Sequence, residues 1–346
     1  MIRVGIAGLG FMGMTHYNAY QKIDGVKVAA LCEKDAVRLA GDWTSIQGNF
    51  GPRGQMMDLS GIARYGELDD LLADRNLDLI DVCLPPSWHA KVTIAALRAG
   101  KHVFCEKPIA LQVSDAQRMT ETAQELGKLL MIGHVLPFHP EYKFAYEAIK
   151  SGRYGRLLGG YFKRIISDPA WLPDFFNPET TGGPMLDLHV HDAHFIRLVC
   201  GMPKAVYSVG TMRGQVVERF TTQFLFDEPK VVSAASGVVH QQGRPFTHGY
   251  EIYLEKATLF FDYMAMPKAG DVVLPLTVLS DDGAVSRPEL GSADPTDAFV
   301  AELSDVVRSV AANKPSALLA GELARDAVVL CQKQTESVIC GRPVEV

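Results

Sequence analysis

Short apolar runs alternate with amphipathic stretches through the first third of the chain. The runs are nearly continuous in Val, Ile, Leu, Ala and Cys, which is typical of strands covered on both faces of a parallel sheet. Strands that alternate with helical stretches predict βαβ units. The predicted strands are residues 2–7, 26–32, 77–84, 102–105 and 129–132, and the predicted helices are residues 12–22, 89–99 and 114–126, the last with Ser114 as its N-cap.

One segment interrupts this alternation. Residues 41–61 are rich in Gly, Gln, Ser and Asn and contain Gly51-Pro52-Arg53-Gly54. Glycine and proline at this density disfavour regular elements. We therefore expect an irregular insertion at this point.

The pattern changes after about residue 135, where strand-like runs follow one another with few helices between them. Such an order predicts a largely antiparallel sheet. The sequence therefore indicates an N-terminal Rossmann domain with a doubly wound parallel sheet, residues 1–132, and a C-terminal α+β domain, residues 133–346. The second domain has predicted strands at 157–166, 205–209, 220–226, 231–235, 250–254 and 258–261, and predicted helices at 141–150, 298–312 and 321–337.

Composition and charge narrow the class of protein. The 346 residues are 47% hydrophobic and 21% charged, an ordinary globular composition. The net charge of −6 gives no electrostatic reason to expect a nucleic acid or a membrane surface as partner. The six cysteines are scattered without a C-x-x-C pair, and no apolar stretch reaches the roughly 18 residues of a membrane span. We expect a cytoplasmic protein with reduced thiols.

Gly8, Gly10 and Gly13 form a G-x-G-x-x-G pattern between a predicted strand and a predicted helix. The first glycine permits a tight turn, the second lets the backbone approach a pyrophosphate, and the third allows close helix–strand packing. Phosphates would lie at the N-terminus of the helix predicted from Met12, next to Phe11 and Met12. The alternative is a tight turn in an unrelated α/β protein.

The acidic residue that would bind the ribose is Glu33, twenty residues after Gly13 at the end of the second predicted strand. A carboxylate there binds the ribose hydroxyls of NAD and repels the 2′-phosphate of NADP. Lys34 and Arg38 follow closely and leave NADP open, although Lys34 also fits a solvated surface charge. The expected cofactor is NAD.

Lys107 is the first candidate for chemistry. It stands in Cys105-Glu106-Lys107-Pro108, directly after a predicted strand, and ligands of doubly wound sheets bind beyond the carboxyl ends of the strands. A partly desolvated lysine near a positive nicotinamide can transfer a proton or polarise a carbonyl oxygen. The alternative is a surface lysine at a strand end.

A histidine-rich stretch offers the second set of candidates. Asp187, His191 and His194 stand at i, i+4 and i+7 and would share one face of a helix that begins near Gly183-Pro184, while His189 points elsewhere. An aspartate one turn before a histidine can orient its imidazole, which makes His191 a candidate general acid and base. The alternatives are a polar helix face with satisfied histidines and a metal site of Asp187, His191 and His194. We expect no resident metal.

With these stretches placed, the chain resembles the Gfo/Idh/MocA family, the glucose–fructose oxidoreductase and inositol dehydrogenase group. The resemblance spans nearly the whole chain and is most specific from Ala99 to Pro108. It implies a Rossmann domain followed by an α/β domain whose open sheet often mediates homodimers or homotetramers. The stretches that carry it are the glycine loop, Leu84-Pro85-Pro86-Ser87-Trp88-His89, the run from Ala96 to Val103, Glu106-Lys107-Pro108, Gly182-Gly183, Asp187, His191 and Gly341-Arg342-Pro343-Val344.

The resemblance also implies roles for single residues. Lys107, Asp187 and His191 match the family's catalytic lysine, aspartate and histidine, so that His191 would exchange the hydroxyl proton and Lys107 would bind the same oxygen. Trp171 lies in a loop that often reaches the substrate, where an aromatic ring could stack on a sugar, although a core or interface role is an equal alternative. Positions that line the cofactor in the family are matched by Gly8, Phe11, Met12, Glu33, Pro85, Ser87, His89, Glu106 and Lys107.

Three functions follow from these residues. The leading one is NAD(P)-dependent hydride transfer to or from a secondary hydroxyl or ketone of a sugar, sugar derivative or cyclitol. The second is a hydrolase or lyase that uses NAD transiently, or a metal at Asp187, His191 and His194. The third is an NAD-responsive regulator, which the joint presence of Lys107, Asp187 and His191 disfavours because such a protein needs none of them.

Overall fold

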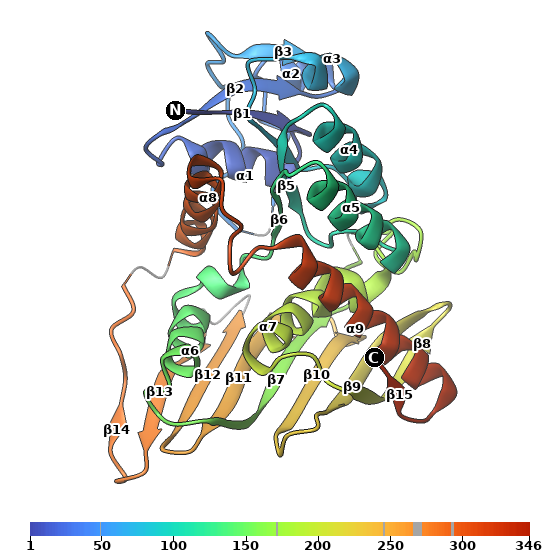
Figure 1. The fold of residues 1–346 in the computed structure, drawn as a ribbon. Helices are drawn as coiled ribbons and strands as arrows, with labels where there is room; N and C mark the ends of the chain where they lie inside the picture. Colours follow the sequence, from blue (N-terminus) through green and yellow to red (C-terminus); the bar gives the residue numbers. More distant parts are fainter. Residues whose placement is uncertain (49, 171, 245, 266–271, 292–293) are drawn as a thin grey trace. The chain divides into compact units, whose positions relative to one another are not determined.

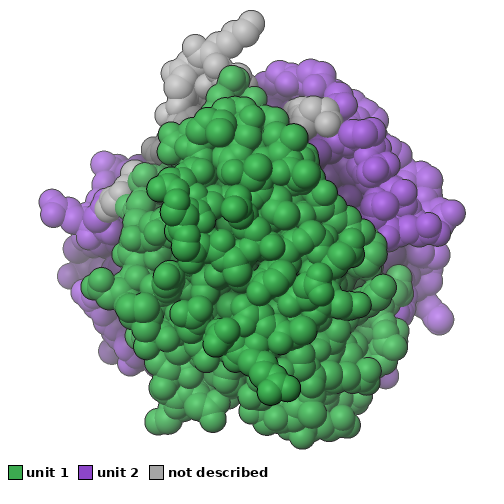
Figure 2. All heavy atoms as spheres, turned by 90° about the horizontal axis from the view of Figure 1, so that it is seen from above, with its two compact units in different colours: residues 1–138, 292–325 green, residues 139–291, 326–346 purple. Residues whose placement is uncertain are grey.

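The computed structural model describes residues 1–48, 50–170, 172–244, 246–265, 272–291 and 294–346. It divides into two compact units, coloured separately in Figure 2. The first comprises Met1–Phe138 and Ser292–Arg325, and the second comprises His139–Gly291 and Asp326–Val346. A single boundary at 132/133 falls close to the first change of unit but does not separate Ser292–Arg325, which returns to the first unit.

The first unit is built on a six-stranded parallel sheet in the order β3-β2-β1-β4-β5-β6 (Figure 1). The order reverses direction between β1 and β4, which is the switch point where doubly wound sheets bind ligands. Helices α1 and α8 pack together on one face, and α4 and α5 pack together on the other. The strands are β1 (Ile2–Ala7), β2 (Val26–Cys32), β3 (Ala63–Tyr65), β4 (Leu79–Val82), β5 (His102–Glu106) and β6 (Leu130–Gly133), and the helices are α1 (Phe11–Tyr20), α2 (Ala36–Leu39), α3 (Leu68–Ala73), α4 (Pro86–Arg98), α5 (Val113–Glu125) and α8 (Pro295–Ala312).

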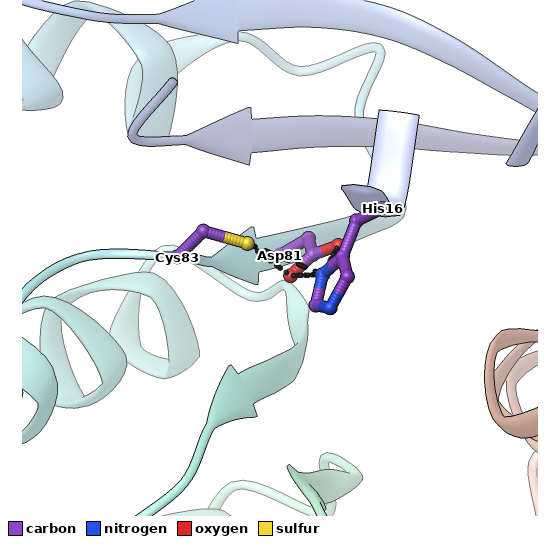
Figure 3. Close-up of side chains that lie close together, drawn as sticks. All are labelled: His16, Asp81 and Cys83. Carbon is purple, nitrogen blue, oxygen red and sulfur yellow. Dashed lines mark hydrogen bonds and ion pairs between the residues drawn. The ribbon is translucent and has the colours of Figure 1, made fainter. Parts of the chain in front are cut away.

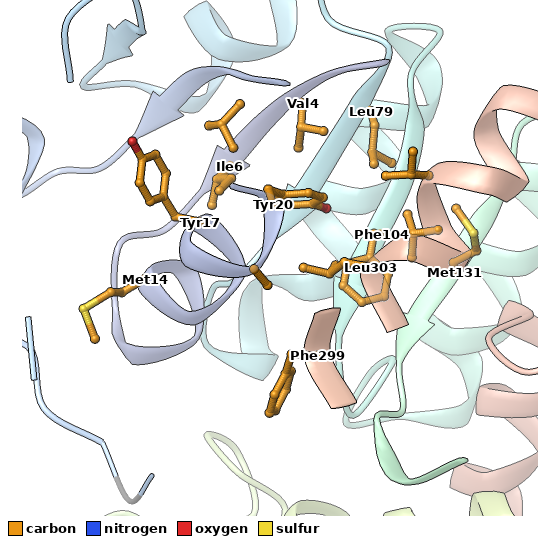
Figure 4. Close-up of a cluster of buried hydrophobic side chains, with 14 of the residues drawn as sticks. Val4, Ile6, Met14, Tyr17, Tyr20, Leu79, Phe104, Met131, Phe299 and Leu303 are labelled. Carbon is orange, nitrogen blue, oxygen red and sulfur yellow. The ribbon is translucent and has the colours of Figure 1, made fainter. Parts of the chain in front are cut away.

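The core of the first unit lies between its sheet and helices α1 and α8 (Figure 4). Val4, Ile6 and Leu79 of the strands and Leu303 of α8 are completely buried. The strands thus lack the alternation of buried and exposed residues that a sheet with one solvated face shows, as their apolar runs predict. One local prediction is wrong: Gln112, not Ser114, is the N-cap of α5, and it makes no side-chain cap hydrogen bond.

The segment 41–61 is irregular in its described residues, as predicted, and it is anchored to the core. Trp43 is completely buried, packs edge-on against Tyr17 of α1 and donates from Nε1 to the carbonyl of Arg38. Asp42 and Met56 pair across the base of the segment. The short elements α2, β3 and α3 that flank it were not predicted, because each has too few residues to show a clear period.

The second unit is built on a nine-stranded sheet in the order β14-β13-β12-β11-β7-β10-β9-β8-β15. Every pairing is antiparallel except that of β7 with β10, which is parallel. Helices α6 and α7 and the second part of α9 lie on one face (Figure 1). The strands are β7 (Leu157–Ser167), β8 (Ala205–Arg213), β9 (Val216–Leu225), β10 (Val231–Val239), β11 (Phe246–Leu254), β12 (Ala257–Ala265), β13 (Val272–Ser280), β14 (Val285–Ser286) and β15 (Val344–Glu345), and the helices are α6 (Pro140–Ser151), η2 (Met185–His189), α7 (Val190–Cys200) and α9 (Gly321–Cys340).

The predicted fold class is confirmed for both units: a doubly wound parallel sheet and a largely antiparallel α+β unit. Strands β13, β14 and β15 were not predicted, and the other strands of the second unit are longer than predicted. Among the described residues, no helix combines the length and the apolar character that crossing a membrane requires.

Candidate functional site

The glycine turn after β1 has the geometry that its three glycines predict. Gly8 has φ +99°, which side chains rarely adopt, and a Cβ there would meet the Cys83 carbonyl oxygen at 2.5 Å. A Cβ on Gly13 would overlap the Gly8 carbonyl oxygen, so only glycine allows α1 to start this close to the strand. A Cβ on Gly10 would meet nothing within 4 Å. Gly10 therefore faces open space, through which a ligand could approach the backbone.

The N-terminus of α1 carries backbone N–H groups that can bind an anion. Gly10 is its N-cap and provides no side-chain acceptor, so the first amides of the helix, at Phe11 and Met12, have no acceptor within the helix. Such amides, together with the helix dipole, favour a phosphate. Phe11 and Met12 are both half-buried, and the ring of Phe11 packs edge-on against Phe50 of the insertion.

Glu33 follows β2 at the same edge of the sheet. Its Oε2 accepts from the Leu9 N–H at 2.8 Å and its Oε1 accepts from the Asp35 N–H at 3.0 Å, so the carboxylate is held beside the glycine turn. The two cationic side chains that could bind the 2′-phosphate of NADP each contact a nearby side chain. Lys34 Nζ lies 5.6 Å from the ring centroid of Trp88, and Arg38 Nε lies 3.7 Å from Asp35 Oδ2.

The residues after β4 divide into exposed and buried positions. Pro85 and Ser87 are exposed at the start of α4. His89 is completely buried, and its Nδ1 and Nε2 each lie 2.8 Å from a carbonyl oxygen, those of Pro108 and Leu84 respectively. Burial lowers the pKa of His89 although both carbonyls oppose this. His89 therefore joins the segment after β4 to the segment after β5 from within the fold.

Glu106 and Lys107 stand at the end of β5, as predicted. Glu106 is buried and its Oε2 accepts from the Lys107 N–H at 3.1 Å. Lys107 is half-buried, and the peptide bond to Pro108 is cis. The carboxyl end of β5 thus presents a lysine at the same sheet edge as the glycine turn and Glu33.

These features of the first unit fit a dinucleotide. Gly10 is open, the α1 amides lack acceptors within the helix, and a fixed carboxylate ends β2, which is where the pyrophosphate and the ribose of a nicotinamide dinucleotide bind in doubly wound sheets. When bound, such a cofactor supplies a hydride acceptor or donor.

The histidine-rich stretch of the second unit differs from the predicted single α-helix. It starts with a π-helical turn, Met185–His189, and continues as α7. A π-turn holds more residues than an α-turn, so the i, i+4, i+7 spacing of a regular α-helix does not by itself place Asp187, His191 and His194 on one face. Asp187 and His191 are half-buried, whereas His194 is completely buried.

The remaining polar residues of this stretch belong to the core of the second unit. Asp192 accepts from Arg164 Nε at 2.7 Å and from Arg164 Nη2 at 3.1 Å, and both side chains are buried. His189 is completely buried and packs edge-on against Phe220. Burial lowers the pKa of His189 to about 4, so this ring is neutral at pH 7. Asp187 and His191 are therefore the two of the stretch that remain accessible for chemistry.

The suggested metal site of Asp187, His191 and His194 does not form a ligand set. Among the described residues, the one group of three His, Cys, Asp or Glu side chains close enough to share an ion is His16, Asp81 and Cys83 in the first unit. This buried group was not predicted, although an aspartate within the apolar strand β4 is a signal that could have found it (Figure 3). Trp171, the predicted stacking residue, lies outside the described residues.

Family comparisons agree with this geometry in both units. Residues 2–134 match the model of an oxidoreductase family with an NAD-binding Rossmann fold, and residues 142–260 match the GFO/IDH/MocA C-terminal domain. The fold, together with the glycine turn, the N-terminus of α1 and Glu33, defines an NAD(P)-dependent oxidoreductase. The chain belongs to the GFO/IDH/MocA family, as the resemblance indicated.

Two of the proteins similar to this chain cover nearly all of it, and a third covers 72%. A myo-inositol 2-dehydrogenase of Thermotoga maritima is 27% identical over 341 residues, which cover 95% of this chain and 94% of that protein. A dTDP-3,4-didehydro-2,6-dideoxy-alpha-D-glucose 3-reductase of Streptomyces violaceoruber is 29% identical over 255 residues, 72% of each chain. A levoglucosan dehydrogenase solved with NADH and levoglucosan has the same fold, with a TM-score of 0.80 at 19% identity over 100% of this chain and 99% of that one.

Proposed function

We propose that this enzyme transfers a hydride between NAD and the carbon of a secondary hydroxyl or ketone in a sugar, sugar derivative or cyclitol. The names of similar proteins support this substrate class: a myo-inositol dehydrogenase, a reductase of a dTDP-linked deoxysugar and a levoglucosan dehydrogenase. The proposed cofactor preference is NAD, because the fixed carboxylate of Glu33 would repel a 2′-phosphate.

The observation that carries the proposal is the position of Lys107. It is half-buried directly after β5, at the sheet edge that also holds the glycine turn, and its backbone N–H is fixed by the buried carboxylate of Glu106. A lysine fixed there can bind the reacting oxygen and stabilise negative charge that develops on it.

His191 is the proposed site of proton exchange. In the oxidative direction it would take the hydroxyl proton as the C=O bond forms, and a bound NAD would supply the acceptor for the hydride that leaves the carbinol carbon. Asp187 would orient the imidazole, which is the role that the family resemblance implies. The joint requirement for Lys107 and His191 separates this mechanism from a regulator that only binds NAD.

Single substitutions test these roles. Lys107→Ala and His191→Ala should each lower kcat by about 10²–10⁴-fold, the usual contribution of a positioned acid or base. The measurement is NADH formation at saturating NAD with a panel of sugars and cyclitols, followed by the absorbance of the reduced nicotinamide at ~340 nm.

Matched controls are available in the second unit. Lys143 is exposed on α6, and the His240 side chain is 75% exposed, so Lys143→Ala and His240→Ala should keep wild-type turnover. Wild-type kcat in either Lys107→Ala or His191→Ala would disprove that residue's role. Product formation without net NADH would instead identify a redox-cycling hydrolase or lyase.

We further propose a homodimer or homotetramer that forms through the face of the nine-stranded sheet that α6, α7 and α9 leave open. Exposed apolar side chains on that sheet, among them Tyr161, Val209 and Val231, support it.

A further inference from the structure

A buried histidine connects the cofactor-binding helix to the strand that carries Lys107. Asp81 is one of four buried residues of β4, in the middle of the parallel sheet, and it is completely inaccessible. An ionised carboxylate in such a place is costly unless it is paired. Its partner is His16 on α1, whose Nδ1 lies 3.0 Å from Asp81 Oδ2 and 3.2 Å from Oδ1 (Figure 3).

The other nitrogen of the same ring faces a second carboxylate. His16 Nε2 lies 3.2 Å from Glu106 Oε1 at the end of β5. This contact is a close ion-pair distance and not an aligned hydrogen bond, since Nε2 has no hydrogen-bond partner among the described residues. Burial lowers the pKa of His16, but Asp81 and Cys83, through charge and hydrogen bonding, together raise it well above its ordinary value.

Titratable groups surround this ring and its partner Asp81. Asp81 lies on β4 and Cys83 directly follows that strand, Glu106 ends β5, Tyr20 ends α1 and Glu302 lies on α8. Burial raises the pKa of the Cys83 thiol and of the Glu302 carboxyl, which favours the neutral form of each. Asp81 and Glu106 are the two carboxyl groups closest to the nitrogens of the ring.

Glu106 uses its second oxygen to fix Lys107. Oε1 faces His16, while Oε2 accepts the Lys107 N–H. A continuous path of contacts therefore runs from α1, which begins at the glycine turn, through His16 and Glu106 to the backbone of Lys107.

We propose that His16 is a positioning residue for hydride transfer. Asp81 fixes the ring at Nδ1, and Nε2 holds the Glu106 carboxylate in place. Glu106 in turn sets the position of Lys107. This inference rests on the role proposed above for Lys107. Small displacements of a reacting group are costly, because a shift of about 1 Å can lower a rate by about 10²-fold.

Two substitutions separate the two nitrogens of the ring. In His16→Gln the side-chain amide reaches the position of Nε2, which faces Glu106, whereas in His16→Asn it reaches only the position of Nδ1, which faces Asp81. We expect kcat to fall by about 10–100-fold in His16→Asn and by less than about 5-fold in His16→Gln. The affinity for ADP-ribose, which lacks the nicotinamide, should change little in both.

His102 provides the control for lost stability. It opens β5 at the opposite end from Glu106, and its Nδ1 accepts from the Leu129 N–H at 3.0 Å. His102→Ala removes a buried hydrogen bond from the same strand and should lower Tm while kcat stays near the wild-type value.

The outcomes are distinct. Equal kcat in His16→Gln and His16→Asn would overturn the inference. A fall of kcat in His102→Ala as large as that in His16→Asn, at a similar loss of Tm, would overturn it too, because lost stability alone would then explain the effect. If His16→Asn does not fold, Asp81→Asn, which weakens the hold on the ring from behind, should lower kcat in the same direction, and wild-type kcat there overturns the inference as well. Full activity in Lys107→Ala would instead remove the proposed function on which the inference rests.

Discussion

The carboxylate of Glu33 is held by two backbone N–H groups, from Leu9 and Asp35, which leaves its charge fixed at the end of β2. Glu33→Gln keeps the shape of the side chain and removes the charge that repels a 2′-phosphate. We expect the ratio of NADP to NAD in kcat/KM to rise by about 10–100-fold, since each tenfold step corresponds to about 1.4 kcal/mol.

Asp35 offers a matched comparison for this change. It is exposed two residues later, and its Oδ1 caps α2 by accepting from the Val37 N–H at 2.9 Å. Asp35→Asn should leave the NADP to NAD ratio unchanged. An unchanged ratio in Glu33→Gln would show that the carboxylate does not select the cofactor.

Glu302 on α8 is a carboxyl group in the opposite situation. It is completely buried, and neither oxygen has a hydrogen-bond partner among the described residues. Burial raises the pKa of Glu302 well above its ordinary value of 4.5. Above pH 4.5 the unfolded chain releases this proton while the folded chain keeps it, so the free energy of unfolding falls as pH rises toward the folded pKa.

Glu302→Met should remove this pH dependence. We expect little change in the free energy of unfolding near pH 4.5 and a gain of about 1–3 kcal/mol at pH 8, measured by urea denaturation at both values. A smaller slope of the same sign should remain, because the pKa of His16 is also raised and its stabilisation is lost as pH rises. Asp297→Asn, an exposed acid on the same helix, should keep the wild-type slope, and an equal slope in Glu302→Met would refute the prediction.

The position of a single residue at the end of a strand could be predicted from the sequence, whereas the roles of these residues remain predictions. The glycine turn, Glu33 and Lys107 each follow a strand end, and the carboxyl ends of parallel strands meet at one edge. The contact of His16 with Asp81 and Glu106 could not be predicted in the same way. These three residues are 65 and 25 positions apart along the chain, and only the packing of α1 on β4 and β5 brings them together.

The turn between β1 and α1 makes opposite demands on two of its glycines. A Cβ on Gly13 would overlap the Gly8 carbonyl oxygen, whereas a Cβ on Gly10 would meet nothing within 4 Å. Gly13→Ala should therefore lower the free energy of unfolding by about 2–4 kcal/mol through overpacking against backbone. Gly10→Ala should keep wild-type stability and weaken NAD binding by about tenfold or more, because the methyl group occupies the space that a pyrophosphate would use.

Thermal unfolding and NAD titration together check this pair. The expected pattern is a loss of Tm without ligand in Gly13→Ala and a loss of affinity without a loss of Tm in Gly10→Ala. Wild-type affinity for NAD in Gly10→Ala would place the pyrophosphate elsewhere.

At the scale of elements, periodicity predicted the long helices and the buried strands but not the irregular turns. The stretch that predicted one α-helix contains the π-helical turn Met185–His189, and Asp187 and His191 are half-buried in this stretch while His194 is buried in the core. An α-helical wheel cannot show this, because the extra residue per turn is set by packing. The anchoring of Trp43 on Tyr17 likewise depends on a tertiary contact within a segment that has no period of its own.

For the whole molecule, the main feature that the order of elements along the chain did not predict is that Ser292–Arg325 belongs to the first unit. Helix α8 packs against α1 and supplies Phe299 and Leu303 to the core of the first unit. Its apolar face predicts a buried helix, but it does not say which unit covers that face.

The open face of the nine-stranded sheet is the surface through which we propose that two copies of the chain associate. Val231 is 74% exposed and precedes the buried Val232, and Val209 is 61% exposed and follows the buried Ser208. Val231 pairs with Gly159, which in turn pairs with Tyr253, another exposed apolar residue, so the exposed positions continue across adjacent strands. Apolar side chains in such rows favour association with a second copy of the chain.

The double substitution Val209→Glu/Val231→Glu should dissociate the assembly, because burying two carboxylates per subunit costs several kcal/mol. Light scattering after size-exclusion chromatography should give the mass of a dimer or tetramer for the wild type and 37.8 kDa for the variant. Val37→Glu, at a valine that is 58% exposed on α2 of the first unit, should leave the mass unchanged. A wild-type mass of one chain would exclude the assembly, and an unchanged oligomeric mass in the double variant would move the interface away from this sheet face, since no association that covers Val209 and Val231 could tolerate both charges.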